Sequence, residues 1–203
     1  MRALNIKICA LVTIVMTMHA IPAASAESWL NIGNNVSTVK IVIDGQEFGA
    51  SSGQYLKGSG RETTVTRNLS GYQRIQIGSG GFDVVYTAGK TYSLKITGDD
   101  NLVPWLETDV AGGELRLSMT RSYSGRLPMT VAITSPKLEA VTIEGSSTIR
   151  LNDIRAANFL IHSDGAGDLT ANGQVAFLKI HIFGTGDVDV KQLIADQVQV
   201  EVK

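Results

Sequence analysis

Apolar and polar residues alternate along most of this chain, in short runs that end near glycine. Leu94 and Ile96 alternate with polar neighbours, and the run Glu114–Met119 repeats the pattern. A period of two predicts β-strands that bury one face, and no long stretch has the period of a helix. The sequence therefore predicts an all-β fold.

A sequence motif recurs towards the C-terminus. It consists of a strand, a glycine turn and usually an acidic residue. Its first glycines are Gly145, Gly165 and Gly184, which lie 20 and then 19 residues apart, and a looser copy covers Ile77–Asp83. A constant period of this length, with a strand and a tight turn in each unit, is typical of stacked β rungs. We therefore expect a right-handed parallel β-helix, a solenoid-like domain with rungs of about 20 residues.

Equivalent residues of successive rungs would stack about 4.8 Å apart. The three glycines would form a corner column, because a tight turn there needs a positive φ that glycine adopts without strain. One aliphatic ladder should point into the core. Its members are Val141, Ile161, Ile180 and Val200.

One short helix is expected at Leu102–Leu106. Acidic or amide residues at 99–101 suit a helix N-cap, and Pro104 suits the first helical turn.

The N-terminal residues predict targeting and a small additional element. Residues 1–26 have the basic start, the apolar stretch Ile8–Met18 and the Ala24-Ser25-Ala26 site of a cleaved signal peptide. Residues 27–66 predict a β-hairpin at Asp44-Gly45 and a Gly/Ser-rich linker, and residues 67–203 form the predicted β-helical domain. We expect an exported protein that lies in the periplasm or at the cell surface.

Charge, cysteine content and hydropathy exclude several kinds of partner and of structural support. The formal net charge is −1, and the signal peptide holds Arg2 and Lys7 without an acid, so the mature chain carries −3 (−1 less +2). This balance disfavours nucleic acid and anionic membranes as partners. Cys9 lies in the signal peptide, so no disulfide is expected, and no later apolar stretch reaches membrane-spanning length.

Several segments in a fixed order resemble a known bacterial family. They are Arg67–Tyr72, Ile75–Val84, Gly98–Thr108, Gly113–Leu115, Val131–Leu138 and the three glycine-centred rungs. Over roughly 67–203 the chain is similar to putative auto-transporter adhesin, head GIN domain proteins, which are exported domains of unknown function. The resemblance implies a β-helical fold with two unlike portions, and it supplies no catalytic residue.

The chain reaches Lys203 where the repeat predicts another Gly-x-Gly turn. This position of Lys203 within the repeat suggests that the domain lacks its last rung, which would leave an open edge. An uncovered edge strand invites pairing with another chain, so a homo-oligomer formed through that edge is one expectation.

Two pairs of side chains are the candidates for a metal site. Asp168 and Asp187 occupy equivalent turn positions, where a calcium ion could relieve their repulsion, although Asp also commonly accepts hydrogen bonds in turns. His162 and His181 occupy equivalent strand positions in line with Glu201, and these are ligand types for zinc. An exposed polar ladder is the simpler interpretation of the histidines, so both pairs are weak candidates and no cofactor is expected.

The sequence favours an exported, non-enzymatic binding or structural module with an adhesin-like role. Its partner would be a polysaccharide or a surface protein. Two alternatives stay open. One is a carbohydrate-active or metal-dependent β-helix enzyme that uses the aspartate column, and the other is a self-association module that uses the open C-terminal rung.

Overall fold

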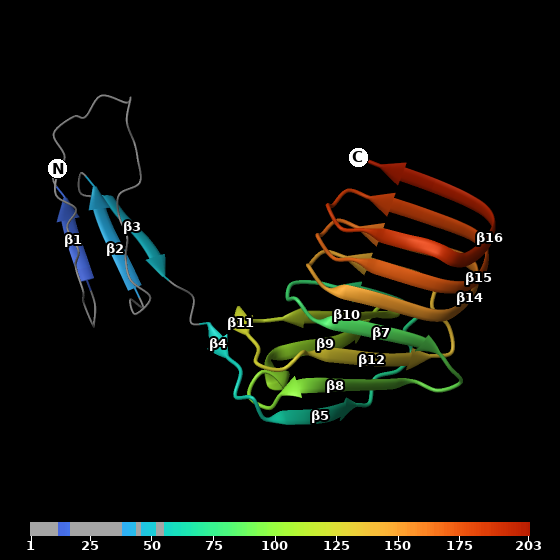
Figure 1. Cartoon of the computed structure of the whole chain (residues 1–203), viewed down its shortest axis with the longest axis horizontal. Helices are drawn as coiled ribbons and strands as arrows, with labels where there is room; N and C mark the ends of the chain where they lie inside the picture. Colours follow the sequence, from blue (N-terminus) through green and yellow to red (C-terminus); the bar gives the residue numbers. More distant parts are fainter. Residues whose placement is uncertain (1–11, 17–37, 44–45, 52–54) are drawn as a thin grey trace. The chain divides into compact units, whose positions relative to one another are not determined.

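The computed structural model describes residues 12–16, 38–43, 46–51 and 55–203 (Figure 1). The chain divides into two compact units, Met1–Tyr55 and Leu56–Lys203. Each unit has its own sheet, and they are described separately below.

The first unit contains a three-stranded sheet formed by β1 (Val12–Met16), β2 (Thr38–Ile43) and β3 (Gln46–Ser51). β1 pairs in parallel with β2, and β2 pairs antiparallel with β3 so that Ile43 lies opposite Gln46. The turn predicted at Asp44-Gly45 falls between these two strands and lies outside the described ranges. β1 falls within the apolar stretch of the predicted signal peptide, whose other residues lie outside the described ranges, so cleavage remains a prediction.

The second unit is built on one sheet of eleven strands. Its strands are β5 (Glu62–Arg67), β6 (Arg74–Ile77), β7 (Asp83–Ala88), β8 (Ser93–Asp99), β9 (Leu106–Ala111), β10 (Glu114–Met119), β12 (Thr130–Ser135), β13 (Ala140–Ile143), β14 (Thr148–Ser163), β15 (Leu169–Ile182) and β16 (Val188–Val202). A separate parallel pair joins β4 (Leu56–Lys57) to β11 (Tyr123–Ser124).

The main sheet curls because the long strand β14 pairs with different strands at its two ends. The neighbour order is β5-β8-β12-β7-β14-β13-β6-β10-β9, and β15 and β16 continue outward from β14. The start of β14 pairs with β7, whereas its end pairs with β13. Figure 1 shows β14, β15 and β16 stacked at one end of this unit. The sheet therefore forms two layers, with β7, β12, β8 and β5 in one and β13, β6, β10 and β9 in the other.

The expected right-handed parallel β-helix is wrong, although the fold is all-β. The sheet is mixed, since the pairs β5–β8, β8–β12 and β9–β10 are antiparallel. Parallel pairing in chain order runs from β13 to β16. The turn between β9 and β10 explains part of the difference: Gly112 and Gly113 have φ of 58° and 78°. Such a two-residue turn closes an antiparallel hairpin, and the Gly-Gly pair was the signal for it in the sequence.

The expected short helix is also wrong, because the segment forms only a 3₁₀ turn, η1, over Val103–Trp105. A single turn gains few hydrogen bonds for the residues it orders, and Leu106 is already extended at the start of β9. Leu102 and Val103 are almost fully buried, so the turn closes the core rather than adding a helix.

The core lies between the two layers and is lined by the inward residues of each strand. The aliphatic ladder expected from the sequence is present in register, as Val141 pairs with Ile161, Ile161 with Ile180 and Ile180 with Val200. Three of its members are buried, but Val200 is 56% exposed. The ladder thus continues from the centre of the core to an outer strand.

Glycines form the corner column, but for a different reason from the one expected. A Cβ on Gly165 would overlap the carbonyl oxygen of Gly145, and a Cβ on Gly184 would overlap that of Gly165. None of the three column glycines has positive φ. The requirement is therefore close contact between the backbones of successive turns, which leaves no room for a side chain.

Buried Asp99 holds together several loops next to the end of β8. Its side chain accepts backbone hydrogen bonds from Gly60 (2.6 Å), Arg126 (2.9 Å) and Leu127 (3.1 Å). Desolvation alone would raise the pKa of Asp99, but these three N–H donors outweigh it and hold the pKa below its ordinary value. A Cβ on Gly58 would overlap this carboxylate, so the packing around it is tight.

Substituting Gly165→Ala should destabilise the second unit by about 3 kcal/mol, because backbone must move to admit the methyl group. Gly81→Ala is the matched control. A Cβ there would lie 3.5 Å from Ser146 Oγ, an ordinary contact, so the change should stay within about 0.5 kcal/mol. Chemical denaturation measures both variants. Equal stability of the two would contradict the close-contact explanation.

Asp99→Asn should destabilise the protein at neutral pH, because an amide cannot accept three N–H bonds as a carboxylate does. A depressed folded-state pKa gives stability that is present above the unfolded value, about 3.9, and is lost as pH falls through the folded value. The difference in unfolding free energy between wild type and variant should therefore be constant above about pH 5 and shrink below about pH 4. Exposed Asp196→Asn serves as control. A difference independent of pH would refute this role.

Candidate functional site

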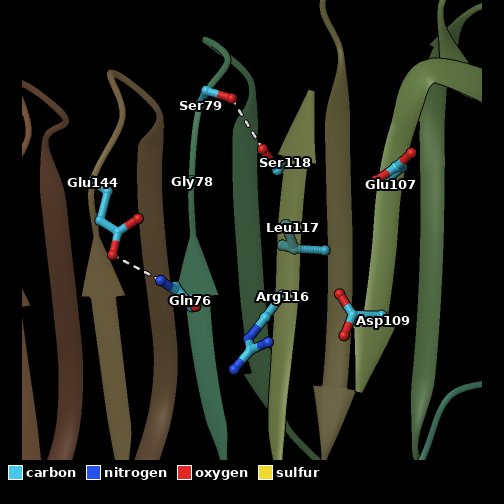
Figure 2. A pocket seen from close by; sticks show the side chains of 9 residues that line it. All are labelled: Gln76, Gly78, Ser79, Glu107, Asp109, Arg116, Leu117, Ser118 and Glu144. Atoms are coloured by element: carbon cyan, nitrogen blue, oxygen red, sulfur yellow. Dashed lines mark hydrogen bonds between the residues drawn. The ribbon is translucent and has the colours of Figure 1, made fainter. Parts of the chain in front are cut away.

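The layer formed by β9, β10, β6 and β13 turns a polar face to solvent. Because successive strand residues point to opposite sides, the residues between the core positions all lie on this outer face. The face is hollowed into a groove of about 430 Å³ (Figure 2). Its lining residues are Gln76, Gly78, Ser79, Glu107, Asp109, Arg116, Leu117, Ser118 and Glu144.

Hydrogen bonds across strands hold several of the lining side chains in place. The Gln76 amide donates to Glu144 Oε1 at 2.7 Å, and the hydroxyls of Ser79 and Ser118 lie 3.0 Å apart. Ser79 also donates to the carbonyl of Met119. Figure 2 shows both pairs, in which β6 and the turn after it reach to Glu144 on one side and to Ser118 of β10 on the other. The groove is thus partly preorganised.

The groove combines three carboxylates with one guanidinium. Arg116 on β10 lies opposite Asp109 on β9 in the strand register, and its Nε lies 3.2 Å from Glu114 Oε1. Glu107 and Glu144 complete the acidic set, so the ionised lining carries a net charge of −2 (one positive, three negative). Closely spaced acceptors and donors of this kind suit a ligand that is rich in hydroxyl groups and carries no negative charge.

The structure brings His162 and His181 together on the same outer face, further along the sheet. They pair in the register of β14 and β15, with ring centroids 6.0 Å apart and planes at 78°. Phe183 lies against both rings, at 5.5 and 6.1 Å. Nε2 of His181 is shielded from solvent and lies 3.7 Å from Glu201 Oε2.

Asp168 and Asp187 also lie on adjacent turns, as the repeat predicts. The carboxylate of Asp168 accepts the backbone N–H of Asp187 at 3.0 Å, so it links one turn to the next. Nearby Asp189 accepts from the backbone of Lys191, and this bond is the main reason why the pKa of Asp189 lies below its ordinary value. The aspartate pair therefore has a structural contact of its own.

The two candidate pairs do not combine into one cluster. Across residues 55–203 and the other described segments, no group of three or more His, Cys, Asp or Glu side chains is placed to hold a metal ion. Metal binding by Asp168, Asp187, His162 or His181 remains a prediction. The groove itself was missed from the sequence, where alternating polar residues at Glu107–Asp109 and Arg116–Ser118 were its only signal.

A comparison with family models identifies the domain. Residues 71–203 match the model described as putative auto-transporter adhesin, head GIN domain. The chain belongs to this family. The match covers most of the second unit, including every strand of the groove, and it agrees with the resemblance found in the sequence.

Solved structures show the fold of this head GIN domain. The crystal structure of a putative adhesin from Bacteroides fragilis is 21% identical with a TM-score of 0.63, covering 73% of this chain and 79% of its own. A putative adhesin from Parabacteroides merdae is 13% identical with a TM-score of 0.53, covering 73% and 80%. At these identities the likeness concerns the fold alone.

No protein with curated function matches the chain significantly. In the part of the chain that the structure describes, none of the helical segments has the length and apolar character needed to cross a membrane. The family's adhesin description is consistent with an exported or cell-surface protein.

Proposed function

We propose that the protein is an exported, non-enzymatic binding module, acting in the periplasm or at the cell surface, and that the groove on β9, β10 and β6 binds a neutral glycan. The observation that carries the proposal is the groove itself, a concave site on the sheet that is lined mainly by polar residues. Membership of an adhesin family supports binding as its role.

The chemistry of the lining supports a carbohydrate. Sugar hydroxyls both donate and accept hydrogen bonds, which matches a lining of carboxylates, an amide, hydroxyls and one guanidinium. The net negative charge disfavours uronic acids and sulfated sugars, since like charges repel across a few ångströms. Among the lining groups, Arg116 is the donor with the most N–H groups.

Arg116→Ala should weaken glycan binding by about tenfold or more, because charged hydrogen bonds contribute about 1.5–3 kcal/mol each. The test screens the full chain against an array of neutral and acidic glycans, then measures the best neutral ligand by calorimetry. Arg150→Ala removes an exposed arginine from β14 outside the groove and should bind as wild type. Preference for acidic glycans, or equal loss in both variants, would contradict the proposal.

Self-association through β16 is a second candidate, favoured by the exposed side chains of that strand. Val198, Val200 and Val202 are 56–66% exposed although they continue core ladders. The backbone N–H of Lys203 donates to the carbonyl oxygen of Ile182 on β15. Backbone groups of successive residues point to opposite sides of a strand, so those of the three valines point away from β15. Among the described strands, β16 pairs with β15 alone.

A second copy of the chain fits this edge by two-fold symmetry. Antiparallel pairing centred on Val200 places Val198 opposite Val202 of the other copy, and the outward backbone groups of both then meet. It also places Gln199 opposite Glu201, so no like charges face each other directly. The edge is therefore complementary to itself.

Val200→Lys should convert a dimer to a monomer, because two ammonium groups would face each other at the symmetry axis. Light scattering over a concentration series measures the mass of wild type and variant. Val65→Lys is the control, since Val65 is a partly exposed valine on β5, at the other edge of the sheet, and the dimer should persist. A wild-type mass of one chain at every concentration would rule out this second candidate.

A further inference from the structure

We propose that the ligand site is a linear track that crosses seven strands, from the groove to the His162–His181–Phe183 cluster, and that it binds an extended neutral polysaccharide. This inference rests on the proposed function of the groove and extends it. It gives the ligand a shape and a length, which the groove alone does not.

The strand register places one outward residue from each of seven strands in a single line. We call this set the polar row. In order across the sheet, its members are Asp109, Arg116, Gln76, Thr142, His162, His181 and Glu201. Three members line the groove, so the row begins in the groove and leaves it at Thr142.

Every member of the row carries a polar group, and together they offer both donors and acceptors. On the strands of the row, the neighbours of each member in sequence belong to the core face, as with Ile161 and Ser163 on either side of His162. The members themselves are half-buried or exposed. A ligand lying along the row would therefore meet a polar side chain at each strand without entering the core.

The far end of the row supplies an aromatic surface. Phe183 is half-buried and packs edge-on or tilted against His162 and His181. The ammonium of Lys203 lies 5.2 Å from the centre of its ring. An aromatic face suits the apolar C–H face of a sugar ring, and a sugar stacked on Phe183 would take the place of the Lys203 ammonium. The groove has no aromatic lining residue, so the two ends would contribute differently.

The spacing of the row matches an extended sugar chain. Neighbouring strands lie about 4.8 Å apart, close to the advance of one hexose in an extended β-1,4-linked chain. Six such steps give a track about 29 Å long, which accommodates about six sugar units. An extended peptide would instead be expected to add to a free strand edge through its backbone, so a ligand that crosses strands favours a glycan.

The test measures how affinity depends on ligand length. Neutral β-1,4-linked gluco-, manno- and N-acetylglucosamine oligosaccharides of two to eight units are titrated into the full chain by calorimetry. The dissociation constant should fall about tenfold or more from two to six units, which corresponds to about 1.4 kcal/mol, and change little beyond six. A peptide of similar length should not compete, and competition by it would overturn the proposal.

Variants at the far end separate the track from the groove. Phe183→Ala and the milder His162→Gln should weaken binding of six units about fivefold or more, while binding of two units stays unchanged. Phe177→Ala removes a half-buried phenylalanine from β15 outside the row and controls for lost packing. Circular dichroism confirms that each variant is folded.

The outcomes distinguish the two proposals. If two units bind through Arg116 but affinity does not grow with length, the track is refuted and the groove stands. If affinity grows with length but Phe183→Ala and His162→Gln have no effect, the track is likewise refuted. If no glycan binds in a way that depends on Arg116, the proposed function fails, and the track fails with it.

Discussion

Close backbone contact at the glycine corner is the constraint on which the long strands depend. Gly145, Gly165 and Gly184 bring each turn against the carbonyl of the turn before it. This contact fixes the register in which β14, β15 and β16 align, and a slip of one residue would exchange the core face with the outer face. The aliphatic ladder and the polar row are thus two consequences of one register. Neither could be moved without moving the other.

The antiparallel strands of the unit depend on a different kind of constraint. Their connections are loops, and Asp99 ties the loop segments at Gly60 and at Arg126–Leu127 to the end of β8 with charged hydrogen bonds. A buried carboxylate is tolerated there because each donated N–H offsets part of the cost of desolvation. The glycine turns are therefore held by backbone packing, and the loops around Asp99 by a single anion.

The sequence was sufficient for features that repeat locally. Strand alternation predicted the all-β class, and the period near 20 predicted that Ile161 aligns with Ile180 and His162 with His181. It was insufficient for pairing between distant segments, such as β6 with β13 or β7 with β12. Those contacts depend on how the chain crosses between layers, which short-range patterns do not encode. The groove was missed for the same reason, because Gln76, Arg116 and Glu144 meet only once these pairings exist.

The face and the edge of the sheet suit different partners, and β16 belongs to both. Its Glu201 side chain ends the polar row on the outer face, while its valines present backbone groups at the edge. Two-fold pairing centred on Val200 keeps the outer faces of both copies on the same side, since the symmetry axis is then perpendicular to the sheet. Glu201 would meet Gln199 of the other copy, so the rows of the two copies would lie side by side at the shared edge, offset by two residues. A long polysaccharide could then contact two tracks at once, and the second contact would form at high effective concentration. Self-association and glycan binding would in that case reinforce each other rather than compete.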